Sequence, residues 1–352
     1  MTAVALAGGL TLALTACGEA PTTPSTSSSA GTYKTCMVTD TGGIDDRSFN
    51  AAAFKGLKNA QAASDLLAEP VAVSSKAEAD YEPNLTQYAQ QECDFILAVG
   101  GLMGAATEKV AAANPTAQFA IVDYKAAPTN VFSMQFDTAQ AAFLAGYLAA
   151  GYSKSGKVAT YGGMKIPPVT IFMDGFADGV AYYNQKKGAS VQVLGWDKAA
   201  QAGTFSDNFC DQAKGKALSD AFVAQGADII FPVAGCTGLG TAAAAKAANN
   251  AYVVIWVDLD GCESAEQYCD QFLTTVVKNI PDAVKDAALK ASTSTGLVSG
   301  GTIGTLANNG VSLAPYHTFD SKIDAGLKAE VEALKADIIS GAVKVTSPAS
   351  PS

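Results

Sequence analysis

The sequence predicts an α/β protein that folds as two similar lobes, each built around a parallel sheet. From residue 32 onward, short apolar runs alternate with longer alanine-rich segments, which is typical of strands joined by helices. The strand-like runs are apolar throughout, as expected where helices cover both faces of a sheet. The alternation repeats on either side of about residue 137, and this repeat favours two lobes over one long sheet.

The predicted elements follow this alternation along the chain. Strands are expected at residues 34–40, 71–75, 94–100, 118–123, 131–136, 157–163, 191–197, 228–235, 253–258 and 272–278. Helices are expected at residues 50–63, 105–113, 139–152, 172–185, 213–225 and 241–249. We expect the first lobe to contain residues 33–136 and about 258–295, and the second lobe residues 137–257 and part of 296–345. Residues 346–352 are expected to form an unstructured tail.

The composition of the 352 residues excludes several classes of protein. With 49% hydrophobic and 16% charged residues, most of the chain should fold around a core rather than remain disordered. The formal net charge is −10 and Arg47 is the only arginine, so nucleic acid is not expected as a partner. The only histidine, His317, excludes a multi-histidine metal site and argues against a histidine-dependent hydrolase.

The motifs that commonly carry enzymatic chemistry are incomplete or misplaced. Residues 151–157 resemble a phosphate-binding P-loop, but they follow a predicted helix, and Val158 replaces the Ser or Thr that binds the metal. Residues 238–240 lack the third glycine of a dinucleotide fingerprint. The acidic pairs at 45–46 and at 258 and 260 do not have the spacing of a calcium loop. We therefore expect no catalytic residue, no cofactor and no metal.

The N-terminal segment indicates export and lipid attachment. Residues 1–16 carry no charge and are mostly apolar or small, which is typical of the apolar part of a secretory signal segment. Residues 14–17 match a bacterial lipobox, in which Cys17 is the residue to be lipidated. Residues 17–32 are rich in Ser, Thr, Pro and Gly and predict a flexible tether. The alternative is a buried helix followed by an ordinary thiol. The first interpretation places the folded protein outside the cell, anchored to the membrane.

Six further cysteines favour disulfides over a metal site: Cys36, Cys93, Cys210, Cys236, Cys262 and Cys269. An even number of cysteines in an exported chain is typical of disulfide bonding. Proximity in sequence favours Cys262–Cys269, and the starts of two predicted neighbouring strands favour Cys36–Cys93. Elimination then leaves Cys210–Cys236. A zinc site is the rival interpretation, but the sequence contains no C-x-x-C motif.

Several predicted strands end in glycine or aspartate, at positions where ligands commonly bind. These positions are Asp40, Gly100–Gly101, Asp123, Gly162–Gly163, Gly235 and Asp258. In open α/β sheets, ligands bind beyond the carboxyl ends of the strands, so we expect these residues to line one crevice. The alternative is that each residue only forms a turn or caps a helix.

The loop after the first predicted strand, residues 39–50, combines turn, capping and aromatic residues. Gly42-Gly43 allows a tight turn with positive φ, and Asp46 and Ser48 are good helix-capping residues. Phe49 is a large ring in a polar loop, and it predicts a stacking platform for a flat ligand. The alternative for Phe49 is packing in the core of its lobe.

This loop resembles the corresponding segment of the basic membrane protein family of bacterial lipoproteins, the nucleoside-binding proteins of ABC transporters. Further matches occur in order through almost the whole body, at residues 118–123, 143–147, 162–164, 226–231, 235–240 and 274–278. Residues 259–262 depart from the family pattern, and the region after residue 291 matches poorly.

The resemblance implies a type I periplasmic-binding-protein fold, in which two Rossmann-like lobes joined by a hinge close on the ligand. It implies a monomeric, lipid-anchored binding protein, not an enzyme, that captures nucleosides, with purine nucleosides favoured, and delivers them to an ABC permease. The alternative is the same fold with a sugar or a signal molecule as ligand, serving a sensor system.

The resemblance also assigns roles to the residues that match the family's motifs. Phe49 would stack on the base, while Asp40 and Asn50 would meet the base or the ribose. Asp123 would line the cleft, and Gly235 would let the backbone approach the ligand. Asp258 would grip the ribose hydroxyls, with Lys278 nearby. Phe176 and Phe231 are alternatives for the second aromatic wall.

Overall fold

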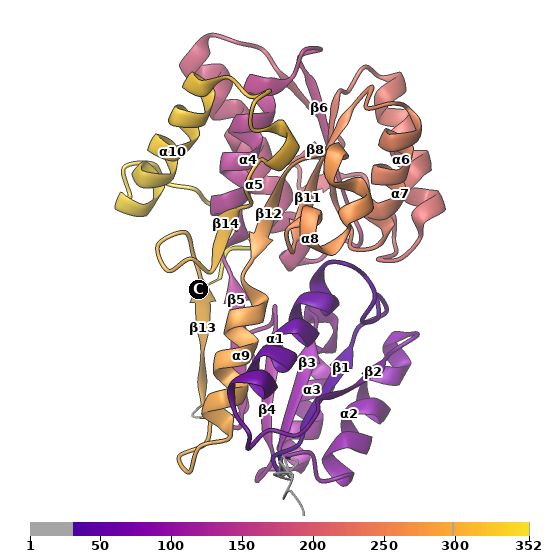
Figure 1. Ribbon diagram of the computed structural model, residues 1–352, viewed down its shortest axis with the longest axis vertical. Coiled ribbons are helices and arrows are strands. Elements are labelled where there is room, and N and C mark those ends of the chain that lie inside the picture. Colours follow the sequence, from indigo (N-terminus) through magenta and orange to yellow (C-terminus); the bar gives the residue numbers. More distant parts are fainter. Residues whose placement is uncertain (1–30, 298, 352) are drawn as a thin grey trace, which may run out of the picture.

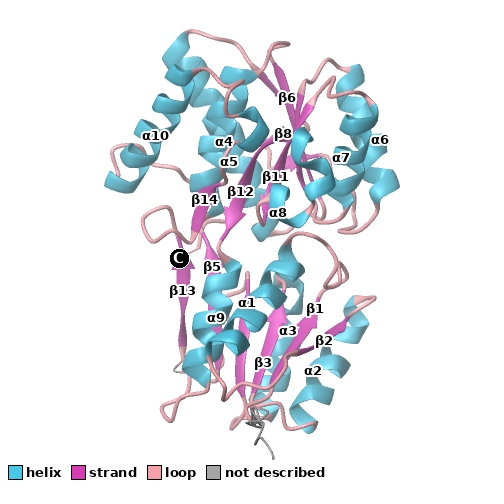
Figure 2. Ribbon diagram, in the orientation of Figure 1, coloured by secondary structure: helices cyan, strands magenta, loops and turns pink. Residues whose placement is uncertain are grey.

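Two α/β lobes, one above the other, form the protein (Figures 1 and 2). The structure is a computed structural model, and it describes residues 31–297 and 299–351. In this part of the chain, each lobe is built on a six-stranded sheet with helices on its faces. The predicted α/β fold with parallel sheets is therefore confirmed. The predicted signal segment, Cys17 and almost all of the tether lie outside the described residues.

The first lobe contains a fully parallel sheet with the order β13-β5-β4-β3-β1-β2. Its strands are β1 (Thr35–Thr39), β2 (Val71–Ser74), β3 (Phe95–Val99), β4 (Gln118–Val122), β5 (Val131–Phe136) and β13 (Gly300–Gly304). Its helices are α1 (Phe49–Ala63), α2 (Tyr81–Gln90), α3 (Gly104–Ala113) and α9 (Ile280–Ala291), with short 3-10 turns at Glu78–Asp80 and Gly101–Met103.

The second lobe contains a sheet with the order β14-β12-β11-β10-β6-β7, in which only β14 runs antiparallel. Its strands are β6 (Lys157–Gly162), β7 (Gln192–Leu194), β10 (Ile229–Val233), β11 (Val253–Asp258), β12 (Phe272–Lys278) and β14 (Val311–Leu313). Its helices are α4 (Thr138–Tyr152), α5 (Pro167–Lys187), α6 (Gln212–Ala224), α7 (Thr237–Ala247), α8 (Gly261–Ser264) and α10 (Ala325–Ser340). A small hairpin of β8 (Trp196–Asp197) and β9 (Ala202–Gly203) and two 3-10 turns at Glu266–Gln271 and His317–Phe319 complete it.

Helices α4 and α5 form the most closely packed helix pair of the second lobe. Almost every residue of α4 is buried, as expected of a helix that is apolar on all sides. The two backbones approach so closely that a Cβ on Gly146 would lie 2.1 Å from the carbonyl oxygen of Phe176. Only glycine permits this approach.

No helix in the described ranges is long and apolar enough to cross a membrane.

The structure divides the chain between the lobes differently from the prediction. Strands β11 and β12 both pair in the sheet of the second lobe, so residues 258–278 do not belong to the first lobe. The chain enters the first lobe after Lys278, forms α9 and β13 there, and returns to the second lobe at β14. Together with the passage from β5 to α4, three chain crossings connect the lobes in the described residues.

The C-terminal residues also differ from the prediction, because they are packed against the second lobe rather than unstructured. The Ser347 hydroxyl donates to the buried carboxylate of Asp174 at 2.6 Å. The Ser350 hydroxyl donates to Asp137, next to the crossing from β5 to α4, at 3.1 Å. Ser350 accordingly lies beside the chain crossing that connects the two lobes. The small polar residues near the end of the sequence are typical of an unstructured tail. In the structure two of these serines donate hydrogen bonds to aspartates that are far away in sequence.

The six cysteines of the described chain form the expected disulfides. Cys36–Cys93 joins β1 to the residues before β3, with a Cα–Cα distance of 6.0 Å. Cys210–Cys236 joins the residues before α6 to those before α7, and Cys262–Cys269 closes the loop after β11, with Cα–Cα distances of 4.6 and 4.4 Å. These bonds occupy the thiols that a zinc site would need.

Candidate ligand-binding site

A cavity lies between the two lobes, where the carboxyl ends of strands from both sheets meet. Most of the strand-end residues line it, namely Asp40, Gly100, Gly101, Asp123, Gly235 and Asp258. Gly162 and Gly163 are not in the lining, because the rings of Phe205 and Phe209 pack against them. The shared position of the strand ends explains why residues from distant parts of the sequence form one cavity.

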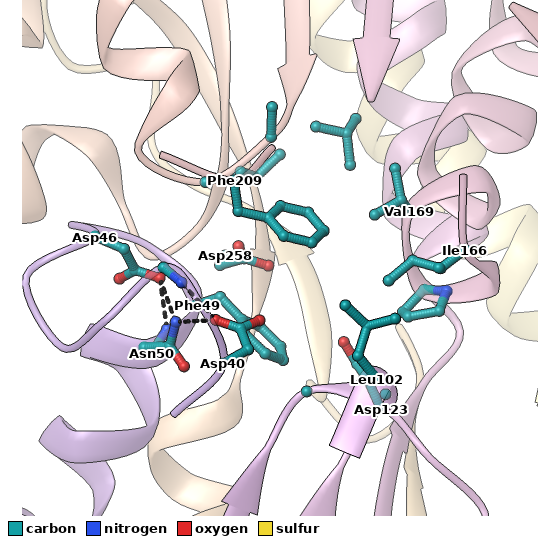
Figure 3. Close-up of a pocket in the computed structure, with 18 of the residues that line it drawn as sticks. Asp40, Asp46, Phe49, Asn50, Leu102, Asp123, Ile166, Val169, Phe209 and Asp258 are labelled. Atoms are coloured by element: carbon teal, nitrogen blue, oxygen red, sulfur yellow. Dashed lines mark hydrogen bonds between the residues drawn. The ribbon is translucent and has the colours of Figure 1, made fainter. Parts of the chain in front are cut away.

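The loop between β1 and α1 forms a hydrogen-bonded polar wall on the first-lobe side (Figure 3). One oxygen of Asp40 accepts hydrogen bonds from the backbone N–H of Gly42 at 2.9 Å and from the side-chain amide of Asn50 at 2.8 Å. The same amide nitrogen donates to Asp46 at 3.1 Å. Asp40, Asp46 and Asn50 are all buried, so these bonds fix the shape of the wall.

Asp123 and Asp258 occupy corresponding places at the ends of strands in the two lobes. Asp123 directly follows β4 in the first lobe, and Asp258 is the last residue of β11 in the second. Both have left-handed backbone conformations, with φ of 65° and 68°. Such conformations are uncommon for residues other than glycine and cluster at functional sites. The two carboxylates line the cavity from opposite lobes.

Lys278 places a buried ammonium group in the middle of this arrangement. It is the last residue of β12, and its Nζ donates to the carboxylate of Asp123. The side chains of the pair are only 3% and 6% exposed. Nζ also lies 4.9 Å from the ring centroid of Phe49 and 5.2 Å from that of Phe172, within cation–π distance. Lys278 therefore links a carboxylate to the aromatic residues of the cavity.

Burial raises the pKa of the carboxyl groups in the cavity. Desolvation raises the pKa of Asp46 to about 6, although three backbone N–H groups oppose the shift. Desolvation likewise raises the pKa of Asp258 to about 6, opposed by Lys278 and by a hydrogen bond from Ser48. Burial also raises the pKa of Asp40 and of Asp123, and Lys278 opposes the shift of Asp123. These four aspartates are the only acidic residues among the described lining residues, and Lys278 carries the only ammonium group there.

The second-lobe wall of the cavity is mostly apolar. It is formed by Ile166, Pro168, Val169, Phe172, Phe209, Val233, Ala234 and Val257. Figure 3 shows Phe209 on the second-lobe side of the cavity and Phe49 on the first-lobe side. Gly163 makes room for the Phe209 ring, since a Cβ on Gly163 would lie 2.4 Å from a carbon of that ring. An apolar wall facing a polar wall suits an amphipathic ligand.

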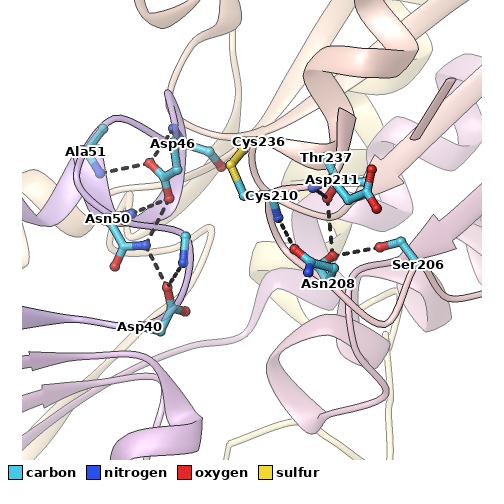
Figure 4. Close-up of a disulfide and its surroundings, with 12 residues drawn as sticks. Asp40, Asp46, Asn50, Ala51, Ser206, Asn208, Cys210, Asp211, Cys236 and Thr237 are labelled. Atoms are coloured by element: carbon cyan, nitrogen blue, oxygen red, sulfur yellow. Dashed lines mark hydrogen bonds between the residues drawn. A yellow bond between two sulfur atoms is a disulfide. The ribbon is translucent and has the colours of Figure 1, made fainter. Parts of the chain in front are cut away.

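The loop that carries Phe209 is held by a disulfide and by hydrogen bonds (Figure 4). The adjacent Cys210 is bonded to Cys236, and the backbone N–H of Cys210 donates to the side chain of Asn208 at 2.7 Å. The hydroxyl of Ser206 donates to the backbone carbonyl of Asn208 at 2.7 Å. These contacts fix the backbone on both sides of Phe209, so its ring is held at the cavity.

The predicted site residues meet in one place, with two exceptions. The residues that line the cavity are Asp40, Phe49, Asn50, Asp123, Gly235, Asp258 and Lys278. Phe176 and Phe231, the alternatives for the second aromatic wall, are not in the lining. Both are fully buried, and their ring centroids are 5.1 Å apart in the core of the second lobe. The prediction missed Asp46, Phe172 and Phe209, although the cysteine next to Phe209 is a signal of a fixed loop.

A two-lobed α/β fold with a cavity between the lobes defines the class of type I periplasmic solute-binding proteins. The structure resembles the solved structure of a solute-binding protein of an ABC transporter system from Aeropyrum pernix. The TM-score is 0.80 at 26% sequence identity, and the match covers 90% of this chain and 93% of that one. A solute-binding protein from Conexibacter woesei, 20% identical with a TM-score of 0.66 over 89% of this chain and 98% of that one, shares the fold.

Sequence comparison identifies the family within this class. Residues 33–314 match the model of PnrA-like ABC transporter substrate-binding proteins. The ABC transporter nucleoside-binding protein BmpA of Lactococcus lactis is 31% identical over 333 residues, which cover 89% of each chain. The CD4+ T-cell-stimulating antigen of Listeria monocytogenes is 32% identical over 331 residues, covering 89% of this chain and 88% of that protein. The chain therefore belongs to the PnrA-like family of ABC transporter substrate-binding proteins, a family that functions outside the cytoplasm.

Proposed function

We propose that this protein captures nucleosides between its two lobes and delivers them to an ABC transporter. The observation that carries the proposal is the composition of the cavity between the lobes. An aromatic ring, Phe49, and two carboxylates, Asp123 and Asp258, line the same space from opposite lobes. A nucleoside combines a flat base with vicinal hydroxyl groups, so it can use both kinds of group at once.

The aromatic residues supply the binding energy for the base. Stacking of a base on an aromatic side chain contributes about 1–3 kcal/mol. Phe49 and Phe209 line the cavity from different lobes, so a base between them would contact both lobes. A ligand that bridges the lobes favours the closed form over the open form, because it binds the closed form better. We propose Phe209, in place of Phe176 or Phe231, as the second aromatic wall.

The carboxylates supply the recognition of the ribose. Hydrogen bonds from hydroxyl groups to an ionised carboxylate are short and strong, and a vicinal diol can donate two of them. Asp258 is buried at the cavity, and Lys278 lies beside Asp123. Asp40 and Asn50 complete the polar wall for the base or the sugar.

The charge of the cavity favours nucleosides over nucleotides. The lining contains the acids Asp40, Asp46, Asp123 and Asp258, and Lys278 is the only Lys or Arg among the described lining residues. A phosphate group would be repelled by the carboxylates and would have no arginine to bind, whereas an uncharged nucleoside has neither problem.

The remaining parts of the proposal concern anchoring and partners. We infer that residues 1–16 are a signal segment, that Cys17 carries the lipid, and that residues 17–32 tether a monomeric binding protein at the outer face of the membrane. The lipobox at residues 14–17 supports this inference. Mass spectrometry of the N-terminal peptide should find an acylated Cys17, and Cys17→Ser should release the protein from the membrane fraction. A free Cys17 within an uncleaved chain would contradict the inference.

Calorimetric titration tests the ligand directly. We expect heat of binding with adenosine, guanosine or inosine, weaker binding with cytidine and uridine, and none with the 5′-monophosphates or with free ribose. The nucleoside should be recovered unchanged after binding. A folded sample with intact disulfides that binds none of the five nucleosides would reject the proposal. Binding of ribose or glucose without nucleoside binding would favour a sugar receptor.

A further inference from the structure

Ser48 stands at the N-cap position of α1 but does not cap the helix. A serine at this position normally accepts a hydrogen bond from the backbone N–H of the second or third helical residue. Here the carboxylate of Asp46 accepts those bonds, from Asn50 at 2.8 Å and from Ala51 at 3.0 Å (Figure 4). It also accepts the backbone N–H of Ser48 at 3.0 Å. The hydroxyl of Ser48 is therefore not needed for capping.

The hydroxyl instead makes a hydrogen bond from one lobe to the other. Ser48 Oγ lies 2.6 Å from Oδ2 of Asp258, a distance typical of a hydroxyl that donates to an ionised carboxylate. Ser48 is 0% exposed and Asp258 is 6% exposed, so water does not compete for this contact. Ser48 precedes α1 in the first lobe, whereas Asp258 ends β11 in the second lobe. The bond therefore connects the two lobes directly.

We propose that Ser48 is a positioning residue that orients the Asp258 carboxylate for the ligand when the lobes close. The proposal rests on the proposed function, in which Asp258 binds the ribose. Ser48 occupies one carboxylate oxygen, so the ligand hydroxyls meet the other oxygen in a fixed orientation. In the open protein Asp258 loses this donor, so the full set of ribose contacts exists only in the closed form. Ser48 thus couples ligand binding to closure.

The charges around Asp258 give the proposal a signature in the pH dependence of binding. The groups that face Asp258 are Lys278 on β12, Asp123 after β4, and Asp40 and Asp46 on the loop before α1. Lys278 and the Ser48 hydroxyl stabilise the ionised carboxylate, whereas the acids and burial oppose ionisation. Removal of the hydroxyl should raise the pKa of Asp258 further. Binding that needs the carboxylate is lost as the pH falls through this pKa, so the loss should begin at a higher pH.

The test compares Ser48→Ala with a matched variant, Ser219→Ala. The Ser219 hydroxyl is equally buried, but its hydrogen-bond partners are the Gly215 carbonyl and the Thr241 hydroxyl inside the second lobe, away from the cavity. Affinities for adenosine, guanosine and inosine are measured between pH 5 and 8. Ser48→Ala should bind about tenfold more weakly at neutral pH, as for loss of a hydrogen bond to a charged group. Its affinity should also fall at a higher pH than that of the wild type, while Ser219→Ala should match the wild type in both respects.

A second comparison separates positioning of Asp258 from general damage. In an Asp258→Ala background, Ser48→Ala should cause no further loss of affinity, because the group that it positions is absent. An equal loss in both backgrounds would overturn the inference. Wild-type affinity and pH dependence in Ser48→Ala would also overturn it, while leaving the proposed function intact. A wild-type protein that binds none of these nucleosides would reject the proposed function, and the inference with it.

Discussion

The two walls of the cavity are built in different ways. The first-lobe wall is polar, and its central residues, Asp40, Asp46, Phe49 and Asn50, come from one loop of the chain. The second-lobe wall is mostly apolar and is assembled from residues near Ile166, Phe209, Val233 and Val257, which are far apart in sequence. Local hydrogen bonds hold the first wall, whereas a disulfide and core packing hold the second.

This difference indicates a division of labour between the walls. A polar wall with fixed acceptors discriminates among ligands, because a group without its partner is costly to bury. An apolar wall supplies stacking and shape, which depend less on the identity of the base. We therefore expect changes in the polar groups of the cavity, which include Asp258 of the second lobe, to alter specificity and pH dependence, and changes in the apolar part of the second wall to alter stability and overall affinity. The predictions below test this expectation.

The largest expected effect follows from loss of the disulfide beside the second wall. Replacement of Cys210 and Cys236 by serine should lower the free energy of unfolding by about 3 kcal/mol, since the bond closes a loop of 26 residues. Affinity should fall too, because Phe209 loses its rigid neighbour. The matched variant lacks Cys262 and Cys269, which are only 7 residues apart, and should lose less stability. Chemical denaturation checks both variants. An unchanged nucleoside affinity in the first variant would show that the disulfide does not support the wall.

The next effect concerns the carboxylate at the end of β11. Asp258→Ala should weaken nucleoside binding by about 1–3 kcal/mol, because a charged hydrogen-bond acceptor is removed. Asp197→Ala removes the same charge from an exposed position in β8, and it should leave binding unchanged. Titration calorimetry at one ionic strength compares the two. Equal affinities for Asp258→Ala and the wild type would refute the ribose assignment.

The aromatic residues allow a direct comparison of the two walls. Phe49→Leu and Phe209→Leu should each weaken binding of purine nucleosides by about 1–3 kcal/mol, because each removes one stacking surface. Phe176→Leu changes a fully buried ring that does not line the cavity, so it should lower the unfolding temperature and leave affinity nearly unchanged. Affinity and thermal unfolding are measured for all three. A large loss of affinity in Phe176→Leu alone would reverse the assignment of the second wall.

The same contrast explains how much of the site could be predicted from the sequence. The strand ends and the loop at residues 39–50 were predictable. The alternation of apolar runs and alanine-rich segments locates the strands, and the carboxyl ends of parallel strands lie at the same edge of a sheet. Phe209 was not predictable in this way, because it follows no strand directly and depends on a disulfide and on the space above Gly163. Phe231 was a misleading choice, since it lies within β10 and faces the core.

The fold was predicted more completely than the connections between its parts. The predicted strands and most helices agree with the structure within a few residues, because apolar runs and alanine-rich segments are local signals. The crossing after Lys278 was missed, because β12 resembles any other buried strand and nothing in its sequence shows which sheet it joins. The role of Ser48 was also hidden, since a serine before a helix predicts a cap.

The smallest expected effect concerns the C-terminal residues that connect the second lobe to the hinge. Ser347→Ala leaves one oxygen of the buried Asp174 without its serine donor, while Trp196 and Gln201 still donate to the other oxygen. The free energy of unfolding should therefore fall by about 1 kcal/mol. Ser350→Ala removes a longer, half-buried hydrogen bond to Asp137, so the loss should be about 0.5 kcal/mol. Because neither serine lines the cavity, nucleoside affinity should stay unchanged in both variants. A change of affinity in Ser350→Ala without a change of stability would instead show that the C-terminal residues restrain the opening of the lobes.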